Sequence, residues 1–460
     1  AESLLKTFGT SRVFWASSQH NATLPDGPYF ATSSGLHRAW RLYDDYTNAF
    51  VLPTIPSAND TNTYEVLPAS GGDLYGAIQI AVPSRLFYKP TPEQPLAGYR
   101  IGVKDQYDIK GLITTFGSRS YAATYPPSNV TSGVIQHLLD QGAVVVGKTK
   151  LSVFANAWFS IAEWPDYSLP FNPRGESYLI PGASSAGSGA SLAAYDWLDI
   201  TIGEDTGGSM RFPAAQNGVY GIRSTKNSTN NTATAFGPFD VAGHFARDVD
   251  SFNTFGAVMY GQSGYKNYTK FPTKILYPRE YWANINPNYT APCEEYVQNL
   301  EAFLGVNRTI VDSNTLWYEY SGSNVSLADY FANTFYRRYF LSANEETCSD
   351  AIVVFPFNGN GGIPWYRDSN ISYTVAGSAP ALPGYISWNY LSVMNESPEV
   401  AVPVGTVKYH SRVSLVEEEF PATVEIQGAV GCDFMLMNLV RAVAYARGLR
   451  KGVRTGSRMY

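Results

Sequence analysis

Residues Ser132 to Thr149 read SGVIQHLLDQGAVVVGKT, and this stretch decides the fold class. Its first half has apolar residues at helical spacing, namely Val134, Ile135, Leu138 and Leu139. Gly142 is a typical helix stop, and the AVVVG run after it has the β-branched composition of a buried strand. A helix that leads at once into a buried strand is one step of an α/β layered fold.

The segment Gly142 to Thr149 also fits the phosphate-binding pattern G-x-x-x-x-G-K-[ST]. A phosphate-binding loop needs a flexible interior, whereas Ala-Val-Val-Val favours an extended strand. We therefore expect Lys148 to be structural. A nucleotide-binding protein stays as an alternative, which thermal shift with Mg-ATP would test.

The organisation on either side of this stretch is that of a larger α/β protein. Residues 1–80 alternate aromatic runs with turn residues and predict a small N-terminal α/β extension. From about residue 81 to 460 the pattern predicts one large domain, in which a strand, IGV, ends at Lys104. Strand-like AIVVFPF and VAVPVGTV and a helix-like FMLMNLVRAVAYARG lie in its last third.

Composition excludes several classes of protein. Charged residues are 16% of the 460, the net charge is −6, and no basic surface for nucleic acid is indicated. No apolar run approaches the roughly 18 residues of a membrane span. We expect a mildly acidic globular protein with no nucleic-acid partner, present as a monomer or homodimer.

The three cysteines, Cys293, Cys348 and Cys432, lack metal-site spacing and allow one disulfide in any of three pairings. We expect neither a metal nor another cofactor. The abundance of glycosylation sequons favours a secreted, N-glycosylated eukaryotic protein, and the acceptor candidates are Asn21, Asn59, Asn129, Asn227, Asn230, Asn267, Asn288, Asn307, Asn324, Asn370 and Asn395. Because AESLLKTFGT lacks the features of a signal peptide, a secreted form would be mature or trimmed.

Candidate catalytic residues point away from histidine. The five histidines lie in no recognisable catalytic context, and an esterase built on Ser185 in ASSAG would need one. Lys104 is a candidate base, because burial would lower its pKa and leave it neutral. Ser- and Gly-rich clusters at 184–189 and 206–209 offer hydroxyls and bare N–H groups for acyl transfer. Singly, a buried lysine is more often ion-paired and a Ser/Gly run more often a loop.

Taken together and in order, the blocks VKDQYDIKG, GAVVVGKTKLSVFA, PGASSAGSGAS and GEDTGGSMRFPAAQNGVYGIRST resemble the amidase signature family of serine hydrolases. GHFARDVDSF and PEVAVPVG resemble later parts of the same family. Four segments, the N-terminal piece, PSRLFYKP, WPDYSLPFNPRG and AAYDWLDITIG, are similar to a group of fungal amidases, often labelled scytalone-dehydratase-like proteins. The resemblance implies an amidase signature fold, with a large mixed β-sheet covered by helices on both faces, and an enzyme that hydrolyses a small-molecule amide.

The resemblance also implies a role for particular residues. Ser209 in TGGSMR corresponds to the nucleophile, Ser184 to the bridging serine held by a cis peptide, and Lys104 to the general base. The N–H groups of the nucleophile loop would form the oxyanion hole, from Thr206, Gly207, Gly208 and Ser209. Side chains that would support the site by hydrogen bonding are Ser185, Asp205 and Arg211.

Two alanines depart from the family pattern. GASSAG stands where the family has GGSSGG, so Ala183 and Ala186 each add a methyl group beside Ser184. An esterase or acyltransferase would use the same residues, and a non-catalytic ligand-binding protein on this fold is the alternative from another class. Reaction of Ser209 with a fluorophosphonate probe would separate a catalytic protein from a non-catalytic one.

Overall fold

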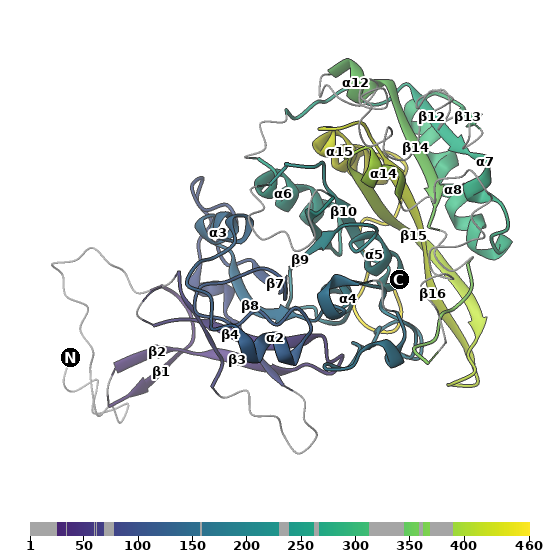
Figure 1. The fold of residues 1–460 in the computed structure, drawn as a ribbon. Coiled ribbons are helices and arrows are strands. Elements are labelled where there is room, and N and C mark those ends of the chain that lie inside the picture. The colour runs from purple at the N-terminus through teal and green to yellow at the C-terminus, as the bar shows by residue number, and fades with distance from the viewer. Residues whose placement is uncertain are drawn as a thin grey trace, which may run out of the picture.

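The computed structural model describes residues 25–33, 35–58, 60, 62–68, 78–156, 159–229, 239–261, 266–311, 345–357, 362–368 and 390–460. Its centre is a mixed sheet of 12 strands, which crosses the molecule in Figure 1. Across the sheet the strands lie in the order β13 (Arg308–Val311), β12 (Lys274–Pro278), β14 (Ala351–Pro356), β16 (Glu417–Gln427), β15 (Glu399–His410), β10 (Tyr220–Arg223), β11 (Val241–Ala246), β9 (Ile200–Asp205), β7 (Arg100–Lys104), β8 (Val144–Thr149), β4 (Phe50–Pro56) and β5 (Tyr64–Val66). The predicted large mixed sheet is confirmed.

The stretch from Ser132 to Thr149 forms the predicted helix and strand. The helix is α3 (Gly133–Asp140), which buries Val134, Ile135 and Leu138. Gly142 has a φ of 93°, a conformation that favours glycine, and β8 follows with every residue buried. β8 pairs in parallel with β7, which pairs in parallel with β9 on its other side. Because β7 ends at Lys104, this lysine lies among three buried central strands.

Helices cover both faces of the sheet. Alternate residues of a strand point to opposite faces, and β15 shows this division directly. Ala401 packs with residues of α4 (Ala186–Ala194) and α5 (Arg211–Asn217), whereas Val400 and Val402 pack with α8 (Pro287–Leu304) and α15 (Asp433–Ala446). The remaining α-helices in the described residues are α2 (Arg119–Thr124), α6 (Val249–Met259), α7 (Arg279–Trp282), α12 (Glu345–Asp350) and α14 (Leu391–Met394).

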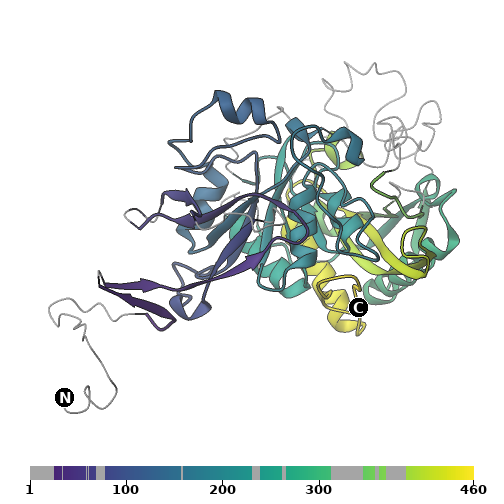
Figure 2. The same cartoon turned by 90° about the horizontal axis from the view of Figure 1, so that it is seen from below.

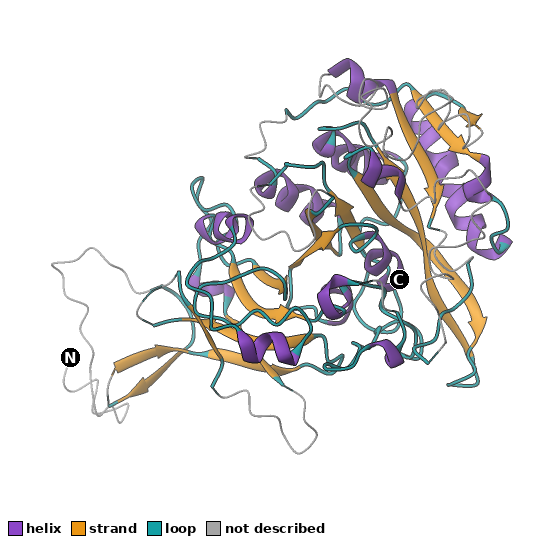
Figure 3. Ribbon diagram, viewed as in Figure 1, coloured by secondary structure: helices purple, strands orange, loops and turns teal. Residues whose placement is uncertain are grey.

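The described part of residues 1–80 consists of strands and loops (Figure 3). β1 (Tyr29–Thr32) and β2 (Gly35–Arg38) form a hairpin, which projects from the body in Figure 2. β3 (Trp40–Asp44) pairs with β6 (Gln79–Pro83). The helical component predicted for this region is absent from its described residues, and β4 joins the main sheet by pairing with β8. The division at residue 80 therefore stays a prediction, whereas the sheet itself continues across it.

The structure pairs two of the three cysteines. Cys348 in α12 forms a disulfide with Cys432, directly before α15, with a Cα–Cα distance of 5.5 Å. Cys293 is buried in α8 and free. The cross-link joins segments that are 84 residues apart in the chain.

The sequons differ in accessibility. The exposed acceptors are Asn129, Asn227, Asn267, Asn288 and Asn307. Asn395 was expected to be an acceptor as well, but its side chain is only 8% exposed, so a glycan on it would have no room in this fold. The other candidates lie outside the described residues: Asn21, Asn59, Asn230, Asn324 and Asn370.

Candidate active site

Lys104, at the end of β7, is completely buried and points at a serine. Its Nζ donates a hydrogen bond to Ser184 Oγ at 2.8 Å and a second one to the Glu204 carbonyl oxygen at 3.3 Å. Neither acceptor is a carboxylate. The ammonium form is therefore held by neutral oxygens alone, in contrast to the usual buried lysine.

Burial lowers the pKa of Lys104 to about 8, and the more distant carboxylates of Glu204, Asp240 and Asp205 oppose this change only in part. An amine with this pKa is half neutral near pH 8, whereas an ordinary lysine, with a pKa near 10.5, is almost wholly charged there. Lys104 is thus able to accept a proton from the hydroxyl that it contacts.

Ser184 follows a cis peptide bond from Ala183 and is completely buried. Its carbonyl oxygen accepts a hydrogen bond from the Ser152 N–H at 3.3 Å. The two alanines that depart from the family pattern are accommodated in the core. Ala183 belongs to the main apolar cluster, and Ala186 packs with Trp164 and Leu169.

Ser209 lies in the turn between β9 and α5, and its carbonyl oxygen accepts a hydrogen bond from the Ser185 N–H at 3.3 Å. Unlike Ser184 and Ser185, which are fully buried, Ser209 is partly exposed. The structure therefore brings the Ser209 turn against the Ser184–Ser185 segment and leaves the outer serine within reach of a substrate.

Close contacts leave little room for a side chain at either glycine before Ser209, and least at Gly208. A Cβ on Gly207 would lie 3.1 Å from the ring of Tyr390. Gly208 has a φ of 125°, and a Cβ there would lie 2.6 Å from the ring of Phe212. The aromatic residues on either side of the turn thus hold it in a shape that side chains would not permit.

One of the four N–H groups predicted to form an oxyanion hole has a partner within the protein. The Gly208 N–H is donated to Asp205 Oδ1 at 2.8 Å, and the Met210 N–H to Asp205 Oδ2 at 3.0 Å. The N–H of Gly208 is therefore occupied in holding the turn. The N–H groups of Thr206, Gly207 and Ser209 stay predicted donors.

Asp205 is the centre of a fully buried charged cluster. Its carboxylate bonds Arg211 through Nε and Nη2, both at 3.1 Å, and Arg223 through Nη1 at 3.1 Å. Burial favours the neutral acid, but Arg211 and Arg223 outweigh it and hold the pKa of Asp205 well below its ordinary value. Asp205 and Arg211, which were predicted to support the site, form an ion pair, and Asp205 also accepts from two N–H groups of the turn that carries Ser209.

Two glutamates complete this cluster, and neither was selected from the sequence. Glu399 accepts from Arg211 Nη1 at 3.1 and 3.2 Å and is completely buried. Burial and the neighbouring Glu399 raise the pKa of Glu425 well above its ordinary value, which favours the protonated acid. Glu399 could have been found from the sequence, because it is a charged residue in PEVAVPVG, an otherwise apolar block with the pattern of a buried strand.

Ser185 connects the start of α4 to β9. Its Oγ donates to the Glu204 carbonyl at 3.3 Å and accepts from the Glu204 N–H at 3.4 Å. Complete burial leaves this hydroxyl out of reach of a substrate, which disfavours an esterase built on Ser185. His244 is buried between the Tyr260 hydroxyl and the Phe252 carbonyl, which account for both nitrogens of its ring.

Lys148, from the apparent phosphate-binding motif, is structural in this fold. It lies within β8, fully buried, with Nζ 2.6 Å from Asp105 Oδ1. The Ile113 carbonyl and the Thr114 hydroxyl accept further hydrogen bonds from the same ammonium. A lysine so enclosed has no donor left for a phosphate.

Within the described residues, no cluster of three or more His, Cys, Asp or Glu side chains could hold a metal ion. None of the helices in that part of the chain is long and apolar enough to span a membrane.

A model of one protein family, described as Amidase, matches residues 78–301. This match covers slightly less than half of the chain. The matched region includes Lys104, Ser184 and Ser209, together with Asp205 and Arg211.

Known proteins resemble the chain in sequence and in fold. It is 34% identical over 211 residues to Amidase 1 of Oryza sativa subsp. japonica and 31% identical over 239 residues to Amidase 1 of Arabidopsis thaliana. These matches cover 45% and 51% of this chain and 46% and 54% of the relatives, so the chain spans about half the length of the curated relatives it matches. The crystal structure of an amidase family protein from Bacillus anthracis str. Ames is 18% identical with a TM-score of 0.55, and the match covers 79% of this chain and 80% of that chain. This last likeness shows the amidase signature fold.

We predict that Glu399→Gln and Glu425→Gln have different effects on stability. Glu399→Gln should lower the free energy of unfolding by about 3 kcal/mol, because it leaves Arg211 buried with one anion fewer. Glu425→Gln should change stability by less than about 1 kcal/mol near pH 7, because it replaces a neutral acid by a neutral amide. Urea denaturation measures both values, with the exposed Glu417→Gln, from a pair with Lys408, as a control for loss of a surface ion pair.

The pH dependence separates the two glutamates further. The folded chain keeps the Glu425 proton above pH 4.5, where the unfolded chain releases it, so wild-type stability should fall as pH rises above that value. Glu425→Gln should remove this component of the slope. Equal losses of stability in the two variants would show that Glu425 is charged and would contradict the prediction.

Proposed function

We propose that the protein is a serine hydrolase that cleaves a carboxamide C–N bond through an acyl-enzyme. The observation that carries the proposal is the 2.8 Å hydrogen bond between Lys104 Nζ and Ser184 Oγ in a fully buried site. A buried amine with a lowered pKa, beside a buried hydroxyl, is an arrangement for moving a proton. Ser209, partly exposed on the adjoining turn, is the proposed nucleophile.

In the proposed mechanism the proton moves through Ser184. As Ser209 Oγ attacks the amide carbonyl, its proton passes to Ser184 Oγ, whose own proton passes to neutral Lys104. Ser184 then protonates the leaving nitrogen and regains a proton from Lys104, so the C–N bond breaks and leaves an ester on Ser209. Water attacks this ester with the same relay as base, which releases the carboxylic acid and restores Ser209.

The buried charged cluster keeps the nucleophile turn in place during these steps. Asp205 holds the N–H groups of Gly208 and Met210, and Arg211 connects Asp205 to Glu399 on β15. A turn held by fixed dipoles need not reorganise when negative charge develops on the carbonyl oxygen. The proposed donors to that oxygen are the N–H groups of Thr206, Gly207 and Ser209.

The names of similar proteins support an amide substrate. Both plant relatives are called Amidase 1. An esterase or an acyltransferase to an amine would use the same acyl-enzyme, and a non-catalytic ligand-binding protein is the other alternative. Retention of Lys104, Ser184 and Ser209 in one site, with Lys104 bonded to Ser184, favours the hydrolase over that alternative.

We further propose that the protein is secreted and N-glycosylated, as expected from the abundance of sequons. The Cys348–Cys432 disulfide supports this proposal, because disulfides persist mainly in oxidising compartments. The exposed sequons supply accessible acceptors, for example at Asn129 and Asn288.

Ser209→Ala should lower kcat by about 10⁴-fold or more without unfolding the chain, because it removes only the attacking oxygen. A fluorophosphonate probe should label the wild type and leave Ser209→Ala unlabelled. Ser228→Ala, which removes a buried hydroxyl bonded to Ser224 Oγ, provides the control and should retain labelling. Catalysis is tested by measuring the turnover of simple aryl and alkyl amides alongside the probe reaction. Equal labelling of Ser209→Ala and the wild type would refute the assignment of Ser209 as nucleophile.

The kcat/KM of the wild type should fall about tenfold per pH unit below about pH 8, because protonation of Lys104 removes the base. Above that pH the profile should level off as the amine becomes fully neutral. Lys104→Ala should lose about 10²–10⁴-fold of the activity at the plateau and lose this acid limb as well.

Lys150 supplies the matched control for this profile. Burial lowers its pKa to about 8 too, but its Nζ bonds Asn48 Oδ1 and the Ser168 carbonyl instead of a site serine. Lys150→Ala should therefore keep the acid limb. If the acid limb vanished in Lys150→Ala and persisted in Lys104→Ala, the titrating group would be Lys150. That result would contradict the proposed relay.

Expression in a eukaryotic host should give a heterogeneous mass that collapses on endoglycosidase treatment, because several acceptors are exposed. Peptide mapping should find glycan on the peptide of Asn129 and none on that of Asn395, which is buried. A secreted product with the mass of the bare chain would contradict glycosylation, and retention inside the cell would contradict secretion.

A further inference from the structure

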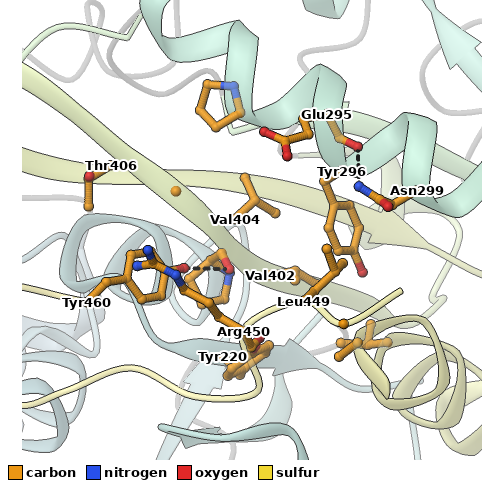
Figure 4. Close-up of a pocket in the computed structure, with 16 residues that line it drawn as sticks. Tyr220, Glu295, Tyr296, Asn299, Val402, Val404, Thr406, Leu449, Arg450 and Tyr460 are labelled. Carbon is orange, nitrogen blue, oxygen red and sulfur yellow. Dashed lines mark hydrogen bonds between the residues drawn. The ribbon is translucent and has the colours of Figure 1, made fainter. Parts of the chain in front are cut away.

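A cavity of about 430 Å³, which neither Ser184 nor Ser209 lines, lies between α8, β15, α15 and the last residues of the chain (Figure 4). Val402 and Val404 line it from β15, and Val402 belongs to the face of the sheet opposite α4. The volume is within the range of about 300–1,000 Å³ that is usual for small-molecule sites. The candidate relay does not use this cavity.

Tyr296, on α8, lines the cavity with a hydroxyl that has no hydrogen-bond partner. Its side chain is only 7% exposed, so the hydroxyl is also shielded from solvent. In Figure 4 its ring points from the helix toward Val402 and Leu449, into the cavity. An unsatisfied buried hydroxyl costs about 1–3 kcal/mol, which a ligand with an oxygen acceptor would recover.

Two other phenols line the cavity, and both already have acceptors. Tyr220 donates to the Arg450 carbonyl at 3.5 Å, and Tyr460 donates to the Pro403 carbonyl at 3.3 Å. Burial raises the pKa of Tyr220, and the phenols of Tyr460 and Tyr296 raise it further, which shows that the three lie near one another. Tyr296 is therefore the member of this group with a donor to offer.

Arg450 is the cation that lines the cavity, and its guanidinium lies 3.9 Å from the centre of the Tyr460 ring. Within the described chain no carboxylate lies within ion-pair distance of it. The lining also includes one acid, Glu295, which is exposed on α8. The other side chains of the wall are largely apolar: Pro292, Val402, Pro403, Val404, Val440, Ala444 and Leu449.

We propose that this cavity is a binding site for a small carboxylic acid with an aromatic or branched aliphatic tail. The Tyr296 hydroxyl donates to the carboxylate, the Arg450 guanidinium supplies the opposite charge, and the tail lies against Val402, Val404 and Leu449. A carboxylate can accept a hydrogen bond from Tyr296 and is attracted by the exposed Arg450, whereas a cation would be repelled by Arg450 and a wholly apolar ligand would leave Tyr296 unpaired.

Isothermal titration calorimetry with 3-phenylpropionate tests the site on the intact chain. The wild type should bind this probe, and Tyr296→Phe and Arg450→Gln should each weaken binding about tenfold or more. Arg458→Gln is the matched control, because Arg458 is exposed on the same terminal segment and does not line the cavity. It should bind with wild-type affinity.

The uncharged 3-phenylpropanol should bind at least tenfold more weakly than the acid. Without ligand, Tyr296→Phe should keep or raise Tm, because it removes only an unpaired hydroxyl. No binding of 3-phenylpropionate to the wild type at millimolar concentration would overturn the proposal. So would unchanged affinity in both cavity variants, equal affinity for the alcohol, or a lower Tm of unliganded Tyr296→Phe.

Discussion

A carboxylate without access to water has to be neutralised by the protein, and this constraint on Asp205 organises the candidate site. Asp205 is 0% exposed and is met by Arg211, Arg223 and two backbone N–H groups. Those N–H groups belong to the turn that carries Ser209. The hydrogen bonds that compensate the charge of Asp205 therefore also determine the shape of that turn. Arg211 in turn needs Glu399, which connects the turn to β15, across the centre of the sheet.

The two buried lysines of neighbouring strands differ in their hydrogen-bond partners, and this difference separates a structural lysine from a candidate base. Lys148 lies 2.6 Å from Asp105, and this ion pair connects β8 to the residue that follows β7. Lys104 is equally buried but bonds a hydroxyl and a carbonyl, so no adjacent carboxylate offsets its charge and its pKa falls to about 8. Desolvation without a direct counter-ion is what makes an amine a base near neutral pH.

β15 connects the two regions of interest in this molecule. Near its start, Glu399 completes the ion network behind Ser209, and a few residues later Val402 and Val404 line the cavity of Tyr296. The alternation of side chains along a strand sends Ala401 to the side of α4 and α5, and Val402 to the side of α8 and α15. One strand can therefore support the turn that carries Ser209 on one face and a separate cavity on the other.

The sequence by itself determined what short-range patterns encode. The helix and strand of 132–149 follow from spacing and glycine position, and Lys104, Ser184 and Ser209 stand out by their motif blocks. Only the tertiary structure decided the partners: which lysine has a carboxylate, that Gly208 gives its N–H to Asp205, that Asn395 is buried, and that Cys348 pairs with Cys432. The physical reason is separation along the chain. Arg211 and Glu399 are 188 residues apart, and no local pattern records that the burial of one charge requires the other.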